Sequence, residues 1–242
     1  MSGHVVFADE RLVAVHKPSG TSLATRQGEP HAAVARLLAA LSAADRARHG
    51  LAAEALWLVH RLDVGTSGLV LLARDPDTHR RLVRLFSERQ VRKTYLALCW
   101  GQPRPRAGRF DQPLGPDRDD RRKMRVDPQG RPARTGYRVL AARPHVSLVE
   151  LHPETGRTHQ LRVHLGHAGH PIVGDDFYGG PRHHGVRDPQ LRAALAPEFT
   201  LLHAWQLWLP PGAERPELQL IADPPPAFAQ ALAALDIELP AE

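Results

Sequence analysis

A single acidic residue between two apolar runs is the feature that most constrains what this chain can fold into. Residues 55–59 (ALWLV) and 69–73 (LVLLA) are each short enough to be buried strands, and residues 65–68 (GTSG) between them favour turns. Asp63 therefore lies where two buried strands meet. Burying a carboxylate there is costly unless a cation pairs with it, although an Asp can also hydrogen-bond its own turn. Asp63 is thus either a structural turn residue or a functional group.

Composition bounds the class of protein. With 242 residues, 42% hydrophobic and 24% charged, the chain resembles soluble globular proteins and can bury a sizeable core. It contains no apolar run near the roughly 18–20 residues that span a bilayer, and residues 1–4 lack the pattern of a secretory signal. The lone Cys99 excludes an internal disulfide and fits a reducing compartment. We therefore expect a cytoplasmic protein without a membrane segment.

The charge of the chain suits a polyanionic partner. Its formal net charge is +6 and its pI is about 10.2. Nearly all cations are arginines, whose side chains form bidentate hydrogen bonds with phosphates and stack on bases. A GC-rich coding sequence would also enrich Arg. Residues 117–125 (DRDDRRKMR) hold five cations and three acids. They fit an arm that meets an RNA backbone and a plain solvated loop about equally.

Periodicity and turn residues predict a chain in which strands outnumber helices. Besides the two apolar runs, strands are expected at residues 4–8, 11–16, 91–100, 134–140, 146–152, 201–209 and 217–222. Helices are expected at residues 31–49, from Asp75-Pro76 onward, and at 158–169, 188–195 and 224–235. The intervening residues 101–130 are expected to form an extended loop region. Without a regular βαβ alternation, the pattern predicts an α+β fold with a largely antiparallel sheet.

Three stretches, in order, resemble motifs of the RluA-type RNA pseudouridine synthases. Residues 59–69 (VHRLDVGTSGL) resemble HRLDxxTSGL, residues 93–101 (KTYLALCWG) resemble K-x-Y-x-A…G, and residues 155–164 (TGRTHQLRVH) resemble TGRTHQ(I/L)RVH. Residues 170–175 (HPIVGD) continue the last match, and residues 202–204 (LHA) are similar to a short element near the C-terminal end of the family. Three ordered motifs carry far more weight than one.

The resemblance implies a fold and a reaction. The expected fold is α+β, a long bent mixed but mostly antiparallel sheet flanked by helices and loops, with a central RNA-binding cleft. It is expected as one catalytic domain over residues 1–242, in the short form without an N-terminal S4 domain and as a monomer. The enzymes are isomerases that break the N1–C1′ bond of a uridine, turn the base and form a C5–C1′ bond. This chemistry needs no cofactor, and the chain has no Gly-rich nucleotide-binding motif.

The resemblance implies roles for four residues of this chain. Asp63 is expected to be the essential catalytic group, acting at C1′, at C6 or on a C2′ proton. Arg162 is expected to keep Asp63 ionised, because a nearby cation lowers a carboxylate pKa. Tyr95 is expected to pack on the target uracil and to help remove the C5 proton. Arg61 is expected to fill the gap left when the uridine is flipped out of the RNA. Strand alternation would place Arg61 and Asp63 on one face and His60 on the other, where His60 is structural.

Other interpretations fit the sequence less well. Histidines recur at residues 164, 167 and 170, but no H-E-x-x-H pattern or partner carboxylate on the helix accompanies them, so no metal site is predicted. A glycosyl hydrolase needs a second carboxylate, and the only acids near a motif are Asp175 and Asp176 in a turn. A non-catalytic RNA-binding protein has no need of an ionised, buried Asp63. The favoured function is therefore isomerisation of uridine in a stem-loop of 23S ribosomal RNA and/or transfer RNA, with a transfer-RNA-only target as the alternative.

Overall fold

The computed structural model describes residues 3–25, 29, 31–212 and 216–240. Contacts divide the chain into two compact units. Unit 1 comprises Met1–Lys93 and Ala204–Pro224, and unit 2 comprises Thr94–His203 and Pro225–Glu242. The expectation of one catalytic domain over residues 1–242 stays a prediction.

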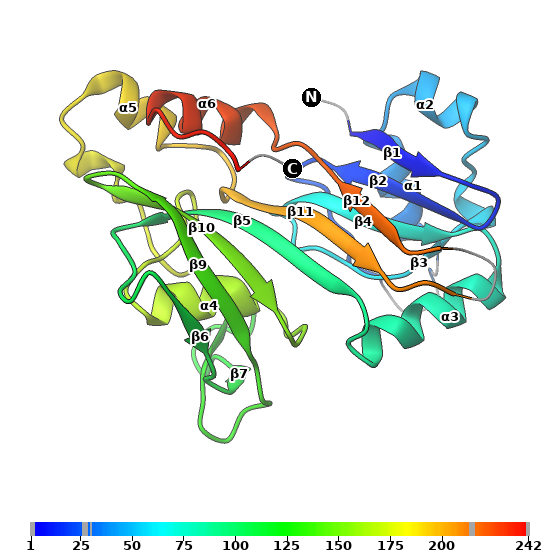
Figure 1. The fold of residues 1–242 in the computed structure, drawn as a ribbon, viewed down its shortest axis with the longest axis horizontal. Coiled ribbons are helices and arrows are strands. Elements are labelled where there is room, and N and C mark those ends of the chain that lie inside the picture. Colours follow the sequence, from blue (N-terminus) through cyan, green and yellow to red (C-terminus); the bar gives the residue numbers. More distant parts are fainter. Residues whose placement is uncertain (1–2, 26–28, 30, 213–215, 241–242) are drawn as a thin grey trace. The chain divides into compact units, whose positions relative to one another are not determined.

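Unit 1 is built on strands that run β1-β2-β4-β11, with β3 paired to β4 and β12 paired to β11 (Figure 1). The pairings of β1 with β2, β2 with β4, β3 with β4 and β11 with β12 are all antiparallel. Strands β2 and β4 are buried along their whole length, and both are mainly apolar on both faces, although β2 ends in the buried His16 and Lys17. The strands are β1 (His4–Ala8), β2 (Leu12–Lys17), β3 (Trp57–Leu58), β4 (Ser67–Ala73), β11 (Leu202–Leu209) and β12 (Leu218–Ile221).

The helix predicted for residues 31–49 is wrong in part, because the structure divides it into two helices, α1 (Ala32–Ala39) and α2 (Ala43–Arg48). Between them the buried Leu41 forms a parallel bridge with Gly3, before the start of β1. Ser42 is extended and accepts a hydrogen bond from Asp45 N at 3.0 Å, so it caps the second helix. The short 3-10 helix η1 (Ala53–Ala55) leads into β3.

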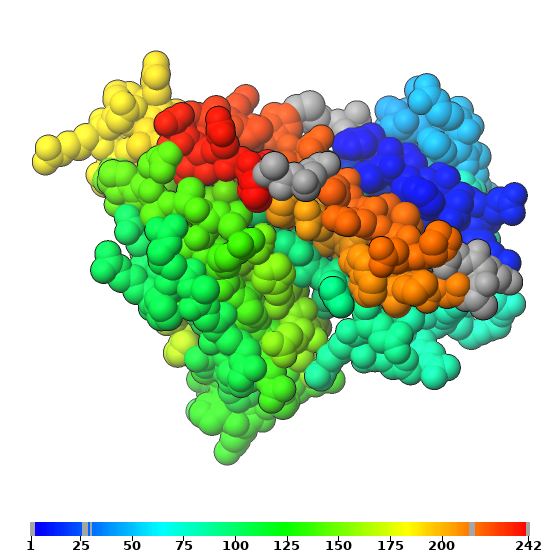
Figure 2. All heavy atoms as spheres, viewed as in Figure 1, coloured from blue at the N-terminus to red at the C-terminus, as the bar shows by residue number. Residues whose placement is uncertain are grey.

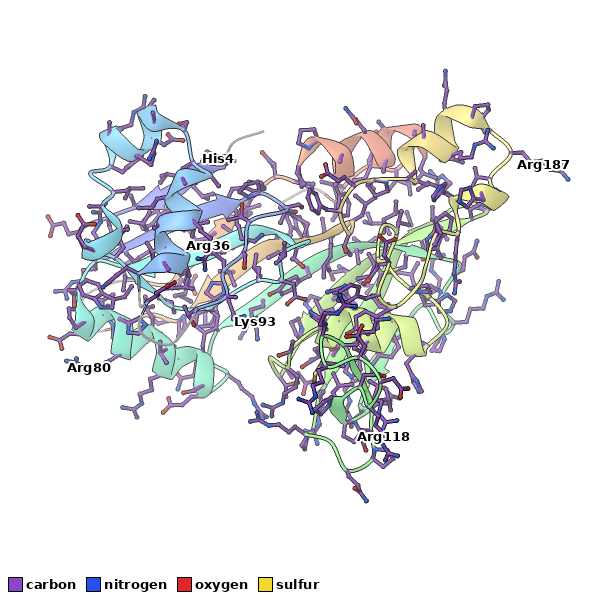
Figure 3. All side chains as sticks on the ribbon, turned by 180° about the vertical axis from the view of Figure 1, so that it is seen from behind. His4, Arg36, Arg80, Lys93, Arg118 and Arg187 are labelled. Carbon is purple, nitrogen blue, oxygen red and sulfur yellow. The ribbon has the colours of Figure 1, made fainter. Side chains whose placement is uncertain are left out.

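The predicted start of the next helix is confirmed. Asp75 accepts a hydrogen bond from Thr78 N at 2.8 Å, and α3 (Pro76–Ser87) begins at the following proline. Leu82 on its inner face joins a core formed with β2, β4, β11 and β12. Arg80, labelled in Figure 3, is exposed on α3. The edge strand β12 exposes part of its surface, and its orange side chains are visible in Figure 2.

Unit 2 contains antiparallel strands in the order β5-β10-β9-β6, and a separate antiparallel pair, β7-β8. Helix α4 packs on this sheet, because its Leu161 and Leu165 lie in one core with Ala97 and Leu151. The strands are β5 (Arg92–Trp100), β6 (Ala107–Phe110), β7 (Leu114–Pro116), β8 (Met124–Val126), β9 (Thr135–Ala142) and β10 (Val146–Pro153). The helices are α4 (Gln160–His167), η2 (His183–Gly185), α5 (Pro189–Ala194) and α6 (Pro226–Ala234).

The predicted α+β class with a mostly antiparallel sheet is confirmed. The extended loop predicted for residues 101–130 is wrong in part, because β6, β7 and β8 lie within it. Each of these strands has only three or four residues, too few to show a period. Within the described residues, no helix is long and apolar enough to cross a membrane.

Candidate functional site

In unit 1, Asp63 lies in the turn between β3 and β4. Its main-chain carbonyl accepts a hydrogen bond from Thr66 N at 3.1 Å, and the neighbouring Val64 carbonyl accepts one from Gly20 N at 2.8 Å. The Asp63 side chain is half-buried. Strand β3 ends at Leu58, so the strand alternation predicted to put Arg61 and Asp63 on one face does not apply. Arg61 itself is exposed.

A buried lysine supports the Asp63 turn from inside the unit. Lys17 is fully buried at the end of β2, and its Nζ donates to the carbonyls of Pro18, Thr21 and Val64 at 2.9, 3.1 and 3.3 Å. Burial lowers the pKa of Lys17 to about 8, and the charge of Asp63 opposes that shift. The sequence alone does not single out Lys17 as a site residue. The signal that could have revealed it is a cation directly after the apolar strand LVAVH.

The glycine of the TSGL segment is required by a close approach between strands. Gly68 has φ +115°, and a Cβ there would lie 2.3 Å from the carbonyl oxygen and 2.7 Å from the nitrogen of Ala204. Ala204 belongs to the LHA stretch in β11. Two separate parts of the family resemblance therefore meet at this point, where only glycine fits.

The expected structural role of His60 is confirmed. Its Nε2 accepts a hydrogen bond from Leu71 N at 3.1 Å, and its ring stacks on Phe86 with centroids 4.6 Å apart. Burial, and to a smaller extent the charge of Lys93, lowers the pKa of His60 to about 3. The imidazole is therefore neutral in the fold and serves as an acceptor for the main chain of β4.

This histidine gives unit 1 a predictable sensitivity to acid. Below about pH 6.5 the unfolded chain binds a proton at His60 that the folded chain excludes until about pH 3, so the free energy of unfolding falls as the pH falls through this window. We expect His60→Gln, which keeps an acceptor, to reduce that dependence by about one proton, or about 1.4 kcal/mol per pH unit. Urea unfolding between pH 4.5 and 6.5 measures it. His145→Gln, in an exposed turn, is the control, and equal slopes for both variants would contradict the prediction.

In unit 2, Arg162 lies in the first turn of α4, as expected, and is held by a buried acid. Its Nε and Nη2 donate to the two carboxylate oxygens of Asp175 at 2.7 and 2.8 Å. The Asp175 side chain is 0% exposed and that of Arg162 is 11% exposed, so the pair is shielded from water. The sequence alone gives Asp175 no role beyond a turn. Tyr95, half-buried in β5 opposite Leu151 of β10, packs at the margin of the neighbouring core.

A chain of hydrogen bonds fixes the start of α4. The Gln160 Oε1 accepts from Thr155 Oγ1 at 2.7 Å and from Arg157 N at 3.0 Å. Its Nε2 donates to the Arg134 carbonyl and to Thr135 Oγ1, both at 2.9 Å. All four hydrogen-bonding positions of the buried amide are thereby used. The TGRTHQ stretch thus builds the platform from which Arg162 projects.

The same series of hydrogen bonds fixes the orientation and the tautomer of His164. Its Nε2 lies 3.1 Å from the Gln112 carbonyl, an acceptor, and its Nδ1 lies 3.0 Å from Thr135 Oγ1. Burial lowers the pKa of His164. Because a carbonyl can only accept, Nε2 carries the proton that it shares with Gln112. Both ring nitrogens bind protein atoms. Among the residues that the structure describes, no group of three or more His, Cys, Asp or Glu side chains could hold a metal ion.

The Gln160 amide is testable on its own. We expect Gln160→Glu to destabilise unit 2 by about 2–4 kcal/mol, because a carboxylate cannot donate to the Arg134 carbonyl and to Thr135. Chemical denaturation at neutral pH measures this, with the exposed Gln129→Glu as the control, expected to change stability by less than about 0.5 kcal/mol. A loss no larger than that of the control would contradict the network.

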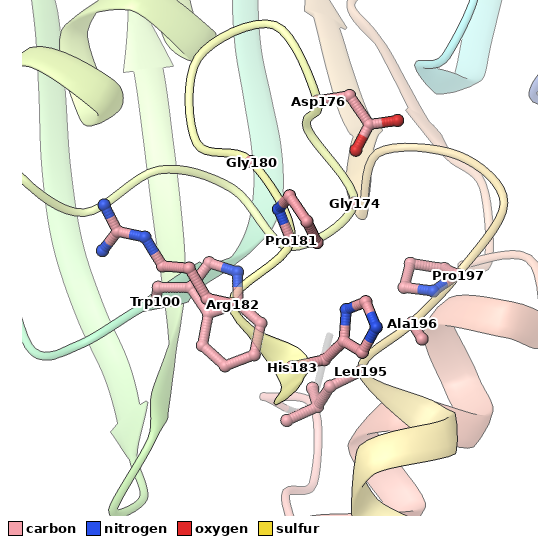
Figure 4. A pocket seen from close by; sticks show the side chains of 10 residues that line it. All are labelled: Trp100, Gly174, Asp176, Gly180, Pro181, Arg182, His183, Leu195, Ala196 and Pro197. Carbon is pink, nitrogen blue, oxygen red and sulfur yellow. The ribbon is translucent and has the colours of Figure 1, made fainter. Parts of the chain in front are cut away.

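Unit 2 also has a small pocket, which contains none of the predicted site residues. It is lined by the Trp100 ring, two prolines, Arg182, His183 and Asp176, among others (Figure 4). Tyr95 and Arg162 are not part of its wall. Of the predicted site residues, Asp63 lies in unit 1, and Tyr95 and Arg162 lie in unit 2. The pairing of Asp63 with Arg162 stays a prediction.

Comparison with known proteins identifies the family. The sequence pattern of the RNA pseudouridylate synthase family matches residues 11–167. The chain belongs to this family. It is 37% identical over 207 residues to the dual-specificity RNA pseudouridine synthase RluA of Escherichia coli K12, covering 84% of each chain. An RNA pseudouridine synthase of Mycobacterium bovis is 35% identical over 96% of this chain and 72% of its own length.

Further relatives agree. An RNA pseudouridine synthase of Chloroflexus aurantiacus is 44% identical over 70% of this chain, and the match spans about half, 52%, of that protein. Human RNA pseudouridylate synthase domain containing 4 has a TM-score of 0.76 and 32% identity, covering 98% of this chain and 95% of its own. Membership of the RNA pseudouridine synthase family confirms the RluA-type resemblance, the fold and the enzyme class predicted from the three motifs. The family match includes Asp63, Tyr95 and Arg162, whose individual roles stay predictions.

Proposed function

We propose that this chain isomerises uridine to pseudouridine in structured RNA, with Asp63 as the catalytic group. The observation that carries this proposal is the support of the Asp63 turn by the buried Lys17. The Lys17 ammonium holds the turn through the Val64 carbonyl, and its charge interacts with that of Asp63. Lys17 thus holds the half-buried Asp63 turn in place, and a carboxylate at a fixed place in the fold is what the first step of the reaction needs.

The reaction can be followed through this chain's own residues. An ionised Asp63 acts on the uridine at C1′, at C6 or at the C2′ proton, and the N1–C1′ bond breaks. The uracil turns, C5 bonds to C1′ as any bond to Asp63 breaks, the proton on C5 leaves to a base and N1 takes up a proton, so atoms and charge balance without a redox step. We assign Tyr95 to stacking on the uracil and to removal of that proton. We propose that no cofactor or metal takes part.

Arg162 suits the role of a fixed cation. Two charge-assisted bonds to Asp175 hold its guanidinium in one plane and shield it from water. We propose that Arg162 pairs with Asp63 in the active enzyme and keeps it ionised. The exposed Arg61, two residues before Asp63, fills the space left in the RNA stack by the flipped uridine.

We propose a stem-loop of 23S ribosomal RNA and/or transfer RNA as the substrate. The likeness to RluA, a relative named for dual specificity, and the pI of about 10.2 support an RNA partner of this kind. A transfer-RNA-only target is the second candidate within the family. We further propose that the enzyme works in the cytoplasm as a monomer.

Tritium release tests this function directly. We expect the purified chain to release tritium from [5-³H]uridine-labelled 23S ribosomal RNA, transfer RNA or both, and carbodiimide mapping of the products to locate the modified uridine. Release from transfer RNA alone would select the narrower substrate. RNA binding without release from either RNA would contradict catalysis and would favour a non-catalytic RNA-binding protein.

A further inference from the structure

An exposed phenylalanine lies in the turn that follows Asp175 in unit 2. The Phe177 side chain is 36% exposed, and Val64 and Val83 are the other exposed large hydrophobic residues of the described chain. Its main-chain nitrogen donates to Asp175 Oδ1 at 3.1 Å, so the position of the residue is set by the acid that holds Arg162. The Phe177 ring is thus held in place while part of it stays open to solvent.

The segment that carries this ring is also tied to the β7–β8 pair. The hydroxyl of Tyr178, the next residue, accepts a hydrogen bond from Met124 N at 2.9 Å and lies 2.8 Å from His159 Nδ1. The turn at residues 175–178 is thus fixed both to α4 and to the start of β8. Phe177 is therefore presented by a rigid support rather than by a loose loop.

Three cations surround the Phe177 ring. The Arg122 guanidinium and the Lys123 ammonium, both from the β7–β8 loop, lie 5.6 Å from its centroid, and the Arg162 guanidinium lies 5.4 Å away. Arg122 is fixed by Asp120, which accepts its Nε and Nη2 at 2.9 and 2.8 Å. The Arg122 side chain is nevertheless 75% exposed, so it can still meet a solvent-borne anion.

Two explanations for the ring can be compared. As a cover for the Arg162–Asp175 pair, Phe177 would need only its contact with Arg162. That role does not account for the exposed part of the ring or for the two cations that the β7–β8 loop brings to it. An accessible aromatic ring beside fixed cations is the arrangement that binds an unpaired nucleotide, with the base on the ring and its phosphates on the cations.

We propose that Phe177 stacks an unpaired base of the RNA other than the target uridine, and that Arg122 and Lys123 bind the adjacent phosphates. The proposal takes RNA as the partner from the proposed function, but it does not require the chain to be catalytic. An acidic peptide is the competing ligand for such cations. It would gain little from an aromatic face, since stacking needs a flat ring.

The salt dependence of RNA binding distinguishes base stacking on Phe177 from phosphate binding by Arg122 and Lys123. The probe is a fluorescein-labelled single-stranded RNA of about 12 nucleotides, titrated by anisotropy between about 50 and 200 mM KCl. We expect Phe177→Leu to weaken binding about fivefold or more at every salt concentration without changing the salt slope, and Phe177→Trp to bind at least as tightly as the wild type. Lys123→Gln should lower the slope by about 0.7. The control is Arg187→Gln, because Arg187 is an exposed cation far from the β7–β8 loop within unit 2 (Figure 3). This substitution should change the salt slope least.

Three outcomes would overturn the proposal, and a fourth would contradict only the proposed function. Binding by folded Phe177→Leu within about twofold of the wild type would exclude stacking, and a lower turnover with unchanged affinity would show that Phe177 acts only through Arg162. If Phe177→Leu weakened binding to a polyglutamate peptide as much as it weakened binding to the RNA, an acidic protein partner would be favoured. Absence of tritium release by a wild type that still binds RNA through Phe177 would contradict the proposed function and leave this site intact.

Discussion

Asp63→Asn is expected to reduce tritium release from [5-³H]uridine-labelled RNA to background, a loss of at least about a thousandfold, while RNA binding is retained. The asparagine has nearly the same shape but carries no charge, so it can neither attack the sugar or base nor accept a proton. The main-chain hydrogen bond from Thr66 N to the Asp63 carbonyl does not depend on the side chain. The variant should therefore fold.

The control for this variant is Asp77→Asn. Asp77 is an exposed acid in the first turn of α3, and its loss should leave turnover within about twofold of the wild type. Melting temperatures and RNA affinities of both variants show whether either change acts through the fold. If Asp63→Asn lowered stability sharply and kept most of its turnover per folded molecule, Asp63 would be a structural turn residue instead.

Gly68→Ala should prevent unit 1 from folding, with a loss of more than about 3–5 kcal/mol against a total stability of about 5–15 kcal/mol. Alanine strains the backbone at φ +115°, and its Cβ would overlap main-chain atoms of Ala204 that cannot move without parting β4 from β11. Soluble yield, near-ultraviolet circular dichroism and urea unfolding measure the effect.

Gly50→Ala is the matched control, because it isolates the cost of the backbone conformation. Gly50 also has a positive φ, +57°, but no other atom lies within 4 Å of the position that an alanine Cβ would take there. We expect a loss of about 1 kcal/mol from this substitution. If the two alanine variants lost similar stability, the close approach of Gly68 to Ala204 would not be what demands glycine.

The features that could be predicted from the sequence are those determined by residues close together in the chain. The Asp75-Pro76 start of α3 is a local capping signal, and β5 and β10 are apolar runs long enough to recognise. The break at Leu41 and Ser42 was not predictable from helical spacing, because Leu41 leaves the helix to pair with Gly3, far away in the sequence. Local periodicity carries no record of such a contact.

The candidate site likewise combines residues that the sequence identifies with residues whose roles depend on long-range contacts. Asp63, Tyr95 and Arg162 are predicted as site residues by the family resemblance, because residue spacing alone does not distinguish a functional Tyr or Arg from a structural one. Lys17 and Asp175 were missed as site residues. Each is a charged residue at the end of an apolar run, and its importance comes from burial and from hydrogen bonds that only the folded chain shows.

The division of unit 1 along the chain has a consequence during synthesis on the ribosome. Strand β4 is made early, but β11, its neighbour, begins only at Leu202. Until then the nascent chain carries an apolar strand, Ser67–Ala73, whose edge has no partner. Unit 1 must therefore mature late in translation, and this interval is when chaperones would most benefit the newborn protein.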